Sequence, residues 1–241
     1  MHREIHKWYS RSLYKEMEIA VYGHYGYTLL LFPTAAADFL EYERFHLIDS
    51  IAQHINTGKI KVVCVNTVNN ECLLNNKIES GHRSIRHGQF NNYIISEVIP
   101  FIQTHANGLV PIVTAGASVG AYHAANFFFR RPDIFSGVIA MSGVYDIKYY
   151  IRDYYDDHCY YNSPVDFLPK ISNHTMLEQM RKSTIVIASG QGAYEDPESS
   201  KQLSNILNAK SIPHWLDLWG NDMRHDWPTW RAMLPYFIDK I

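Results

Sequence analysis

Short runs of apolar residues alternate with amphipathic segments along most of the chain. Continuous apolar runs rich in β-branched residues are typical of strands buried on both faces. They occupy residues 29–32, 61–65, 111–115, 136–141, 184–188 and 214–218. Apolar residues at helical spacing, or helix start signals, mark residues 40–55, 93–102, 121–131, 196–208 and 227–237. Strands that alternate with helices predict an α/β fold with a mostly parallel central sheet and helices on both faces.

Two segments depart from this alternation. In residues 3–22, Met17, Ile19 and Val21 alternate with polar or small neighbours, which predicts an N-terminal antiparallel hairpin with one buried face. Residues 66–86 are polar and rich in asparagine, which predicts a long loop. No repeat, low-complexity tract or linker divides the sequence, so we expect a single domain over residues 1–241.

Composition favours a single α/β domain and argues against nucleic-acid-binding and membrane-spanning proteins. A chain of 241 residues that is 46% hydrophobic suits one α/β domain with a well-buried core. The balance of 22 basic against 24 acidic residues, without a basic stripe, argues against a nucleic-acid partner. No apolar run is long enough to span a membrane, and the first residues lack the apolar core of a signal peptide. The scattered Cys64, Cys72 and Cys159 favour a reducing compartment, so we expect a cytoplasmic location; the oligomeric state stays open.

The histidines give one weak metal signal. His2 and His6 lie four residues apart with Glu4 between them, a spacing that metal ligands use. They stand at the start of the chain, outside any predicted helix, and a mobile terminus is the simpler account. We therefore expect no metal and no organic cofactor.

The stretch Gly-Ala-Ser-Val-Gly at residues 116–120 lies between a predicted buried strand and a predicted helix. In that context a Gly-x-Ser-x-Gly pattern predicts a nucleophile elbow, a strained turn that holds the hydroxyl of Ser118 clear of the sheet. The amides of the helix start then face developing negative charge. A simple small-residue loop is the alternative, and the strand and helix on either side favour the elbow.

Activation of Ser118 needs a base and an acid that orients the base. In open α/β sheets such groups stand beyond the carboxyl ends of strands. His225 follows the last predicted strand, which favours it as the base. Glu195 and Asp196 both follow the strand before it, but Asp196 precedes Pro197 at a helix start and is expected to cap that helix. Glu195 is therefore the predicted acid, with Asp196 as the alternative.

The predicted oxyanion hole combines the amide of Val119 with a second amide from the loop after residues 29–32. Pro33 has no N–H, so Thr34 and Ala35 remain as alternatives for the second donor. Small alanines follow in that loop and leave room for an acyl oxygen.

An insertion at residues 144–181 is crowded with tyrosines and lies between two predicted strand ends. A lid or a wall of the acyl pocket suits that place, and Tyr154 and Tyr155 are the candidate substrate-binding residues. The alternative is that the rings pack the insertion onto the domain while the phenol groups meet water.

Four stretches carry a family resemblance: residues 116–120, Pro-Asp-Ile-Phe at 132–135, Ser-Gly-Val-Tyr-Asp at 142–146 and His-Asp-Trp-Pro-Thr-Trp at 225–230. With them the chain resembles the esterase D-related branch of the α/β-hydrolases, which includes feruloyl esterases, S-formylglutathione hydrolases and mycolyltransferases. Small bacterial serine esterases with Phe-Pro-Thr, here at 32–34, and Gly-Gln-Gly, here at 190–192, are nearer still. The resemblance covers about residues 15–240. Many relatives carry His-Gly where this chain has Pro33 and Thr34, which bears on the second oxyanion donor.

The resemblance implies the α/β-hydrolase fold and hydrolysis of small carboxylic esters by Ser118, His225 and an acid. A serine carboxylesterase that forms an acyl-enzyme on Ser118 is the predicted function. An acyltransferase with the same residues is one alternative, because only the nucleophile that reaches the acyl-enzyme differs. A non-catalytic binding protein on this fold is the other.

Overall fold

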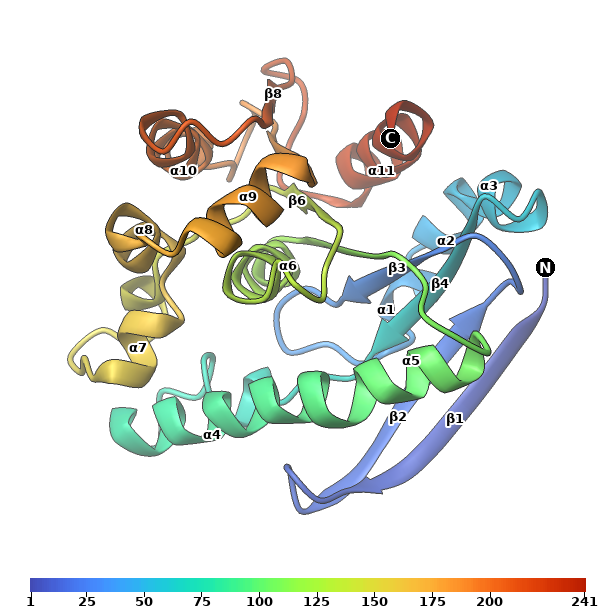
Figure 1. Ribbon diagram of the computed structural model, residues 1–241, viewed down its shortest axis with the longest axis horizontal. Coiled ribbons are helices and arrows are strands. Elements are labelled where there is room, and N and C mark those ends of the chain that lie inside the picture. The colour runs from blue at the N-terminus through green and yellow to red at the C-terminus, as the bar shows by residue number, and fades with distance from the viewer.

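A computed structural model describes all residues, 1–241, and eight strands form one mixed sheet in the order β1-β2-β4-β3-β5-β6-β7-β8 (Figure 1). The strands are β1 (Arg3–Ser10), β2 (Lys15–Tyr22), β3 (Tyr27–Phe32), β4 (Ile60–Val65), β5 (Ile112–Ala117), β6 (Gly137–Met141), β7 (Thr184–Ser189) and β8 (Trp215–Leu218). Strand β2 runs antiparallel to β1 and to β4, and all other neighbours are parallel. The predicted hairpin and mostly parallel sheet are confirmed.

Helices cover both faces of the sheet, because residues of each buried strand alternate between two apolar cores. Leu30 and Phe32 of β3 join the larger core, and Leu29 and Leu31 join the smaller one. The larger core holds α4 (Ser80–Tyr93), α5 (Ile99–His105), α6 (Val119–Arg130), α9 (His174–Lys182) and α10 (Pro197–Ala209). The smaller core holds α1 (Glu41–Arg44), α2 (Leu47–Ser50), α3 (Ala52–Asn56) and α11 (Trp227–Lys240).

The predicted insertion at residues 144–181 contains no strand. It forms α7 (Asp157–Tyr161), α8 (Pro164–Phe167) and α9, with 3₁₀ turns at Ile147–Tyr149 and Leu168–Lys170. None of the helices in the protein combines the length and the apolar character that a membrane-spanning segment requires.

Two predicted segments differ from the structure. The polar loop is shorter than predicted, because α4 begins at Ser80 and runs through a π-helical turn (Ile94–Val98) into α5. Pro100 lies in the first turn of α5, and the wider π turn before it accommodates the missing proline N–H. The predicted helix at residues 40–55 is three short helices. Helix α4 escaped prediction because its buried face carries polar residues such as Arg83 and His87, which hide the apolar periodicity.

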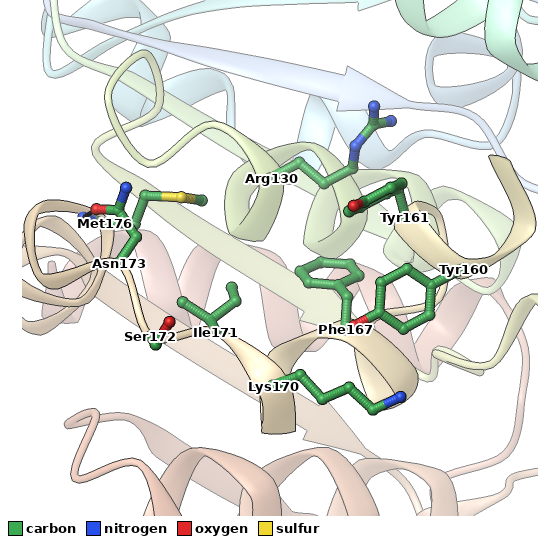
Figure 2. A pocket seen from close by; sticks show the side chains of 9 residues that line it. All are labelled: Arg130, Tyr160, Tyr161, Phe167, Lys170, Ile171, Ser172, Asn173 and Met176. Atoms are coloured by element: carbon green, nitrogen blue, oxygen red, sulfur yellow. Dashed lines mark hydrogen bonds between the residues drawn. The ribbon is translucent and has the colours of Figure 1, made fainter. Parts of the chain in front are cut away.

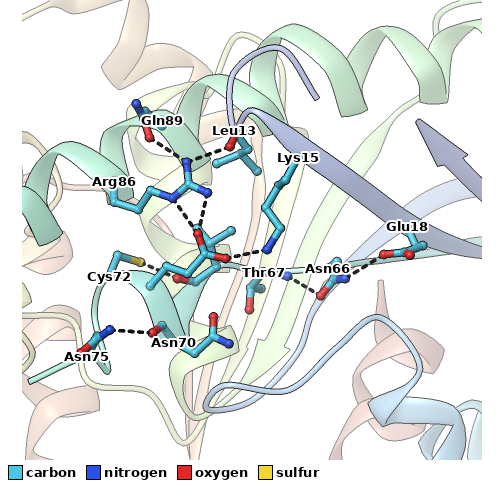
Figure 3. Close-up of polar contacts among 12 residues, drawn as sticks. Leu13, Lys15, Glu18, Asn66, Thr67, Asn70, Cys72, Asn75, Arg86 and Gln89 are labelled. Atoms are coloured by element: carbon cyan, nitrogen blue, oxygen red, sulfur yellow. Dashed lines mark hydrogen bonds and ion pairs between the residues drawn. The ribbon is translucent and has the colours of Figure 1, made fainter. Parts of the chain in front are cut away.

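The loop of residues 66–79 is anchored by charged side chains (Figure 3). The carboxylate of Glu71, in a 3₁₀ turn (Asn69–Glu71), accepts hydrogen bonds from Lys15 and from Arg86 of α4. Arg86 also donates to the carbonyl oxygen of Leu13 in the hairpin turn. These contacts tie the loop to the hairpin on one side and to α4 on the other, which fixes its position beside the oxyanion loop.

Candidate active site

Ser118 occupies the turn between β5 and α6. Its backbone has φ 56° and ψ −123°, a conformation that is costly for a residue with a side chain. The turn needs very close chain approach, because a Cβ atom on Gly120 would lie 2.1 Å from the carbonyl oxygen of Phe32. The N–H of Ser118 donates to the carbonyl oxygen of Met141 in β6 at 2.9 Å. Neighbouring strands thus hold the strained turn, and they fix the backbone position from which the Ser118 hydroxyl projects.

His225 lies in the loop between β8 and α11 and faces Ser118. Its Nε2 atom is 2.9 Å from the Ser118 Oγ atom, and its Nδ1 atom is 3.4 Å from Oε2 of Glu195. The backbone N–H of His225 donates to the carbonyl oxygen of Ala193, and the ring of Trp230 packs edge-on against the imidazole with 5.2 Å between centroids. The imidazole is therefore placed between a hydroxyl and a carboxylate, which is the geometry of a general base.

Glu195 has a fully buried side chain and three polar partners. Its carboxylate accepts hydrogen bonds from Ser142 at 2.7 Å and from Ser189 at 3.2 Å, in addition to the contact with His225. Burial raises the pKa of Glu195, but hydrogen bonds from His225 and the two serines outweigh it and hold the pKa below its ordinary value. The carboxylate is ionised at neutral pH and can stabilise an imidazolium.

Asp196 is engaged elsewhere, in the role expected from the sequence. Its Oδ1 atom accepts the backbone N–H of Ser199 at 3.3 Å and caps α10. The structure therefore brings Glu195, and not Asp196, to His225. The loop that carries Glu195 packs tightly on the loop that carries His225, since a Cβ atom on Gly190 would lie 2.2 Å from the carbonyl oxygen of Met223.

The two alternatives for the second oxyanion donor differ in their hydrogen bonds. Thr34 is occupied, because its N–H and its hydroxyl donate to the buried carboxylate of Glu41 at 2.7 Å and 2.6 Å. Ala35 has φ 38°, in the left-handed region, and its N–H has no acceptor in the protein. Val119 is the first residue of α6, where N–H groups have no intrahelical partner. Of the predicted donors, Val119 and Ala35 therefore have free backbone N–H groups, and Thr34 does not.

A chain of neutral side chains holds the Ala35 peptide. The carbonyl oxygen of Ala35 accepts Nδ2 of Asn69 at 2.6 Å, and Oδ1 of Asn69 lies 2.8 Å from Nε2 of His123 on α6. Burial lowers the pKa of His123 to about 3, so the ring is neutral and its Nε2–H donates to Asn69. The sequence motifs did not single out this pair. The one available signal was the position of His123 on the elbow helix.

Comparison with protein families settles which enzyme class this is. The family model described as "Putative esterase" matches residues 10–237. The chain belongs to this esterase family. Its membership confirms the resemblance noted in the sequence, and it makes the protein a hydrolase. No curated protein matches the chain at a significant level.

Solved structures share the α/β-hydrolase fold with this esterase over almost its whole length. A ferulic acid esterase has a TM-score of 0.77 at 16% identity, and the match covers 99% of this chain and 97% of the ferulic acid esterase chain. S-formylglutathione hydrolase (FrmB) from Staphylococcus aureus has a TM-score of 0.69 at 16% identity, with 100% and 99% covered. Mycobacterium tuberculosis MPT51 (FbpC1) has a TM-score of 0.73 at 14% identity, with 100% and 98% covered. At these identities the likeness shows the fold.

Tyr154 and Tyr155 of the esterase are engaged within the insertion. The hydroxyl of Tyr154 donates to Asp156 at 3.1 Å, and the hydroxyl of Tyr155 donates to Asp166 at 2.7 Å. Neither makes a hydrogen bond to Ser118, and their role in substrate binding stays a prediction. Other tyrosines of the insertion pack onto the domain: Tyr145 and Tyr150 are buried in the larger core, and the hydroxyl of Tyr145 is buried with its ring and does not meet water.

A cavity of about 370 Å³ opens beside the insertion, where Phe167, Ile171 and Met176 supply much of its apolar lining (Figure 2). Arg130 also lines it, and Arg130 is the last residue of α6, whereas Ser118 immediately precedes the first. The cavity therefore lies at the end of α6 away from the serine and is separate from the site around Ser118.

Proposed function

We propose that this esterase hydrolyses small carboxylic esters through an acyl-enzyme on Ser118. The observation that carries the proposal is the unbroken contact from the Ser118 hydroxyl through His225 to the buried Glu195 carboxylate. This arrangement stands on a strained turn at the start of α6, and the N–H groups of Val119 and Ala35 have no acceptor in the protein. A nucleophile, a base, an orienting acid and two oxyanion donors are the parts that acyl transfer requires.

In the proposed mechanism His225 takes the proton of Ser118 as the oxygen attacks the ester carbonyl carbon. The N–H groups of Val119 and Ala35 bind the oxyanion of the tetrahedral intermediate. When the intermediate collapses, the bond to the alcohol oxygen breaks and His225 protonates the departing alkoxide. Water, deprotonated by His225, then attacks the acyl-enzyme; the bond to the Ser118 oxygen breaks, His225 returns the proton to that oxygen, and the acid is released. Glu195 stays ionised and stabilises the imidazolium in both steps.

The test combines a substitution with chemical labelling. Ser118→Ala is expected to lower kcat for p-nitrophenyl acetate and butyrate by a factor on the order of 10⁴ or more, because the nucleophile is lost. Ser172→Ala, in the cavity at the far end of α6, is the matched control and should keep full activity. An organophosphonate should add once, on Ser118.

Four outcomes would overturn parts of the proposal. Full activity of Ser118→Ala, or a label on another serine, would remove Ser118 as the nucleophile. Absence of turnover in the unmodified protein would favour the binding-protein alternative. Formation of a new ester in preference to acid, when an alcohol acceptor is added, would favour acyl transfer.

A further inference from the structure

We propose that His2, Glu4, His6 and His105 form a binding site for a divalent transition-metal ion, Zn²⁺ above all, that ties β1 to α5. Glu4 and His6 occupy alternate positions of β1, so their side chains lie on the same face of the strand. His105 is the last residue of α5 and meets them from the helix that packs on that face. Ligand atoms of Glu4, His6 and His105 all lie within 4.8 Å of one another.

Three imidazoles converge on the one carboxylate. Nε2 of His6 is 2.7 Å and Nε2 of His105 is 3.1 Å from Oε2 of Glu4, and Nε2 of His2 contacts Oε1 of the same group. A tetrahedral site with zinc-to-ligand bonds of about 2.0–2.1 Å has its ligand atoms about 3.3 Å apart, which is close to these separations. An ion can therefore replace the protons shared by Glu4, His6 and His105 without rearrangement of the backbone, and a turn of the His2 side chain brings its Nε2 atom to the same ion as the fourth ligand.

The donor set selects the kind of ion. Three nitrogen donors and one carboxylate suit Zn²⁺ and neighbouring first-row ions, whereas Mg²⁺ and Ca²⁺ prefer oxygen ligands. The side chains of His2, Glu4 and His6 are each about one third exposed, so an ion can enter from solvent. The site is on the β1 edge of the sheet, whereas Ser118 follows the central strand β5, so we assign it a structural role.

The ammonium group of Lys61 is expected to weaken metal binding by His105, and this gives a specific test of the site. Its Nζ atom lies 3.2 Å from Nδ1 of His105, so the ammonium group donates to that nitrogen when no metal is bound. When Nε2 of His105 binds a metal, its Nδ1 atom carries the proton and needs a hydrogen-bond acceptor. The ammonium group of Lys61 is only a donor, so it cannot accept this hydrogen bond. Lys61→Gln removes the charge and supplies a carbonyl oxygen that accepts from Nδ1–H. This change is therefore expected to tighten binding about 10-fold.

The experiment is a titration of the metal-free full chain with ZnCl₂, followed by calorimetry and by thermal unfolding. We expect one ion per chain, a rise in Tm with zinc concentration that a chelator reverses, and tighter binding by Lys61→Gln. The double variant His6→Asn and His105→Asn should lose both binding and the rise in Tm. His46→Asn is the control, because the exposed His46 pairs with Asp49 alone.

Co²⁺ in place of Zn²⁺ gives a readout that needs no variant, because tetrahedral coordination by nitrogen and oxygen produces an intense visible absorption. Absence of saturable binding by the unmodified protein, or binding that survives the double variant, would overturn the proposal. An octahedral cobalt spectrum would reject the four-ligand site. Weaker binding by Lys61→Gln would reject the role given to His105.

Discussion

Ser118 is flanked by two histidines that are held in opposite ways. His225 is 26% exposed at its side chain, and each ring nitrogen faces a group of the proposed mechanism, Ser118 on one side and Glu195 on the other. His123 is completely buried on α6, bonds Asn69 through Nε2 and has no partner for Nδ1. One imidazole can exchange a proton with its surroundings, and the other can only stay neutral.

The difference shows that the His225 side of the elbow depends on charge and solvent access, whereas the His123 side depends on buried neutral hydrogen bonds. The base side uses a charged carboxylate and a solvent-facing ring, because a proton must move there during each turnover. In the proposed mechanism the oxyanion side uses buried neutral groups, Asn69 and His123, to hold the carbonyl of Ala35, the residue whose own N–H is the proposed donor. Burial therefore decides whether a histidine next to this serine contributes a proton or only a position.

The largest effect should come from the acid on the base side. Glu195→Gln is expected to lower kcat by several orders of magnitude, about 10⁴-fold, because an amide cannot stabilise the imidazolium. Asp196→Asn should keep most activity, since asparagine caps a helix nearly as well. Steady-state kinetics with p-nitrophenyl butyrate measures both. An inactive Asp196→Asn beside an active Glu195→Gln would transfer the acid role to Asp196.

A smaller effect is expected on the oxyanion side. Asn69→Ala releases the Ala35 carbonyl and displaces the oxyanion donor. It should lower kcat about 10²-fold with little change in KM, because this donor binds the substrate oxygen only in the transition state. His123→Leu should give the same pattern more weakly, since Asn69 remains. His87→Phe is the matched control, because the buried His87 packs near His123 without a bond to the loop. Equal losses in His87→Phe and His123→Leu would mean that packing alone explains the effect.

The same comparison shows what the sequence could and could not reveal. Ser118, Glu195 and His225, which the structure brings together, could be proposed from the sequence because each follows a strand end, and short apolar strands are visible in a sequence. Asn69 and His123 were not found, because polar groups buried by the tertiary fold leave no periodic signal. The start of α4 was missed for the same reason, and the choice between Thr34 and Ala35 depended on the buried Glu41, which only the structure places beside them.

The smallest effect concerns stability and its dependence on pH. Burial lowers the pKa of His123 to about 3 and that of His87 well below its ordinary value. Below about pH 6.5 the unfolded chain binds protons that the folded chain refuses, so the free energy of unfolding should fall as pH falls. The expected slope is about 1.4 kcal/mol per pH unit for each such histidine.

Urea unfolding between pH 7 and pH 5 measures this slope, in a range where most carboxylates stay ionised in both states. His87→Phe should reduce the slope by the contribution of one buried histidine. An unchanged slope in His87→Phe would show that this ring takes up its proton in the folded protein. Substitution of the exposed His46 should leave the slope as it is.

The contact between Ser118 and His225 joins residues that are 107 positions apart, across parallel strands that each need a crossover helix. Such long-range pairing is slow to form, because closing long loops costs chain entropy before the contacts repay it. The hydroxyl and the imidazole meet only when β6, β7 and β8 are all in place beside β5. We therefore expect esterase activity to recover later than tryptophan fluorescence when the denatured chain is diluted into buffer, so that catalysis itself reports the last event of folding.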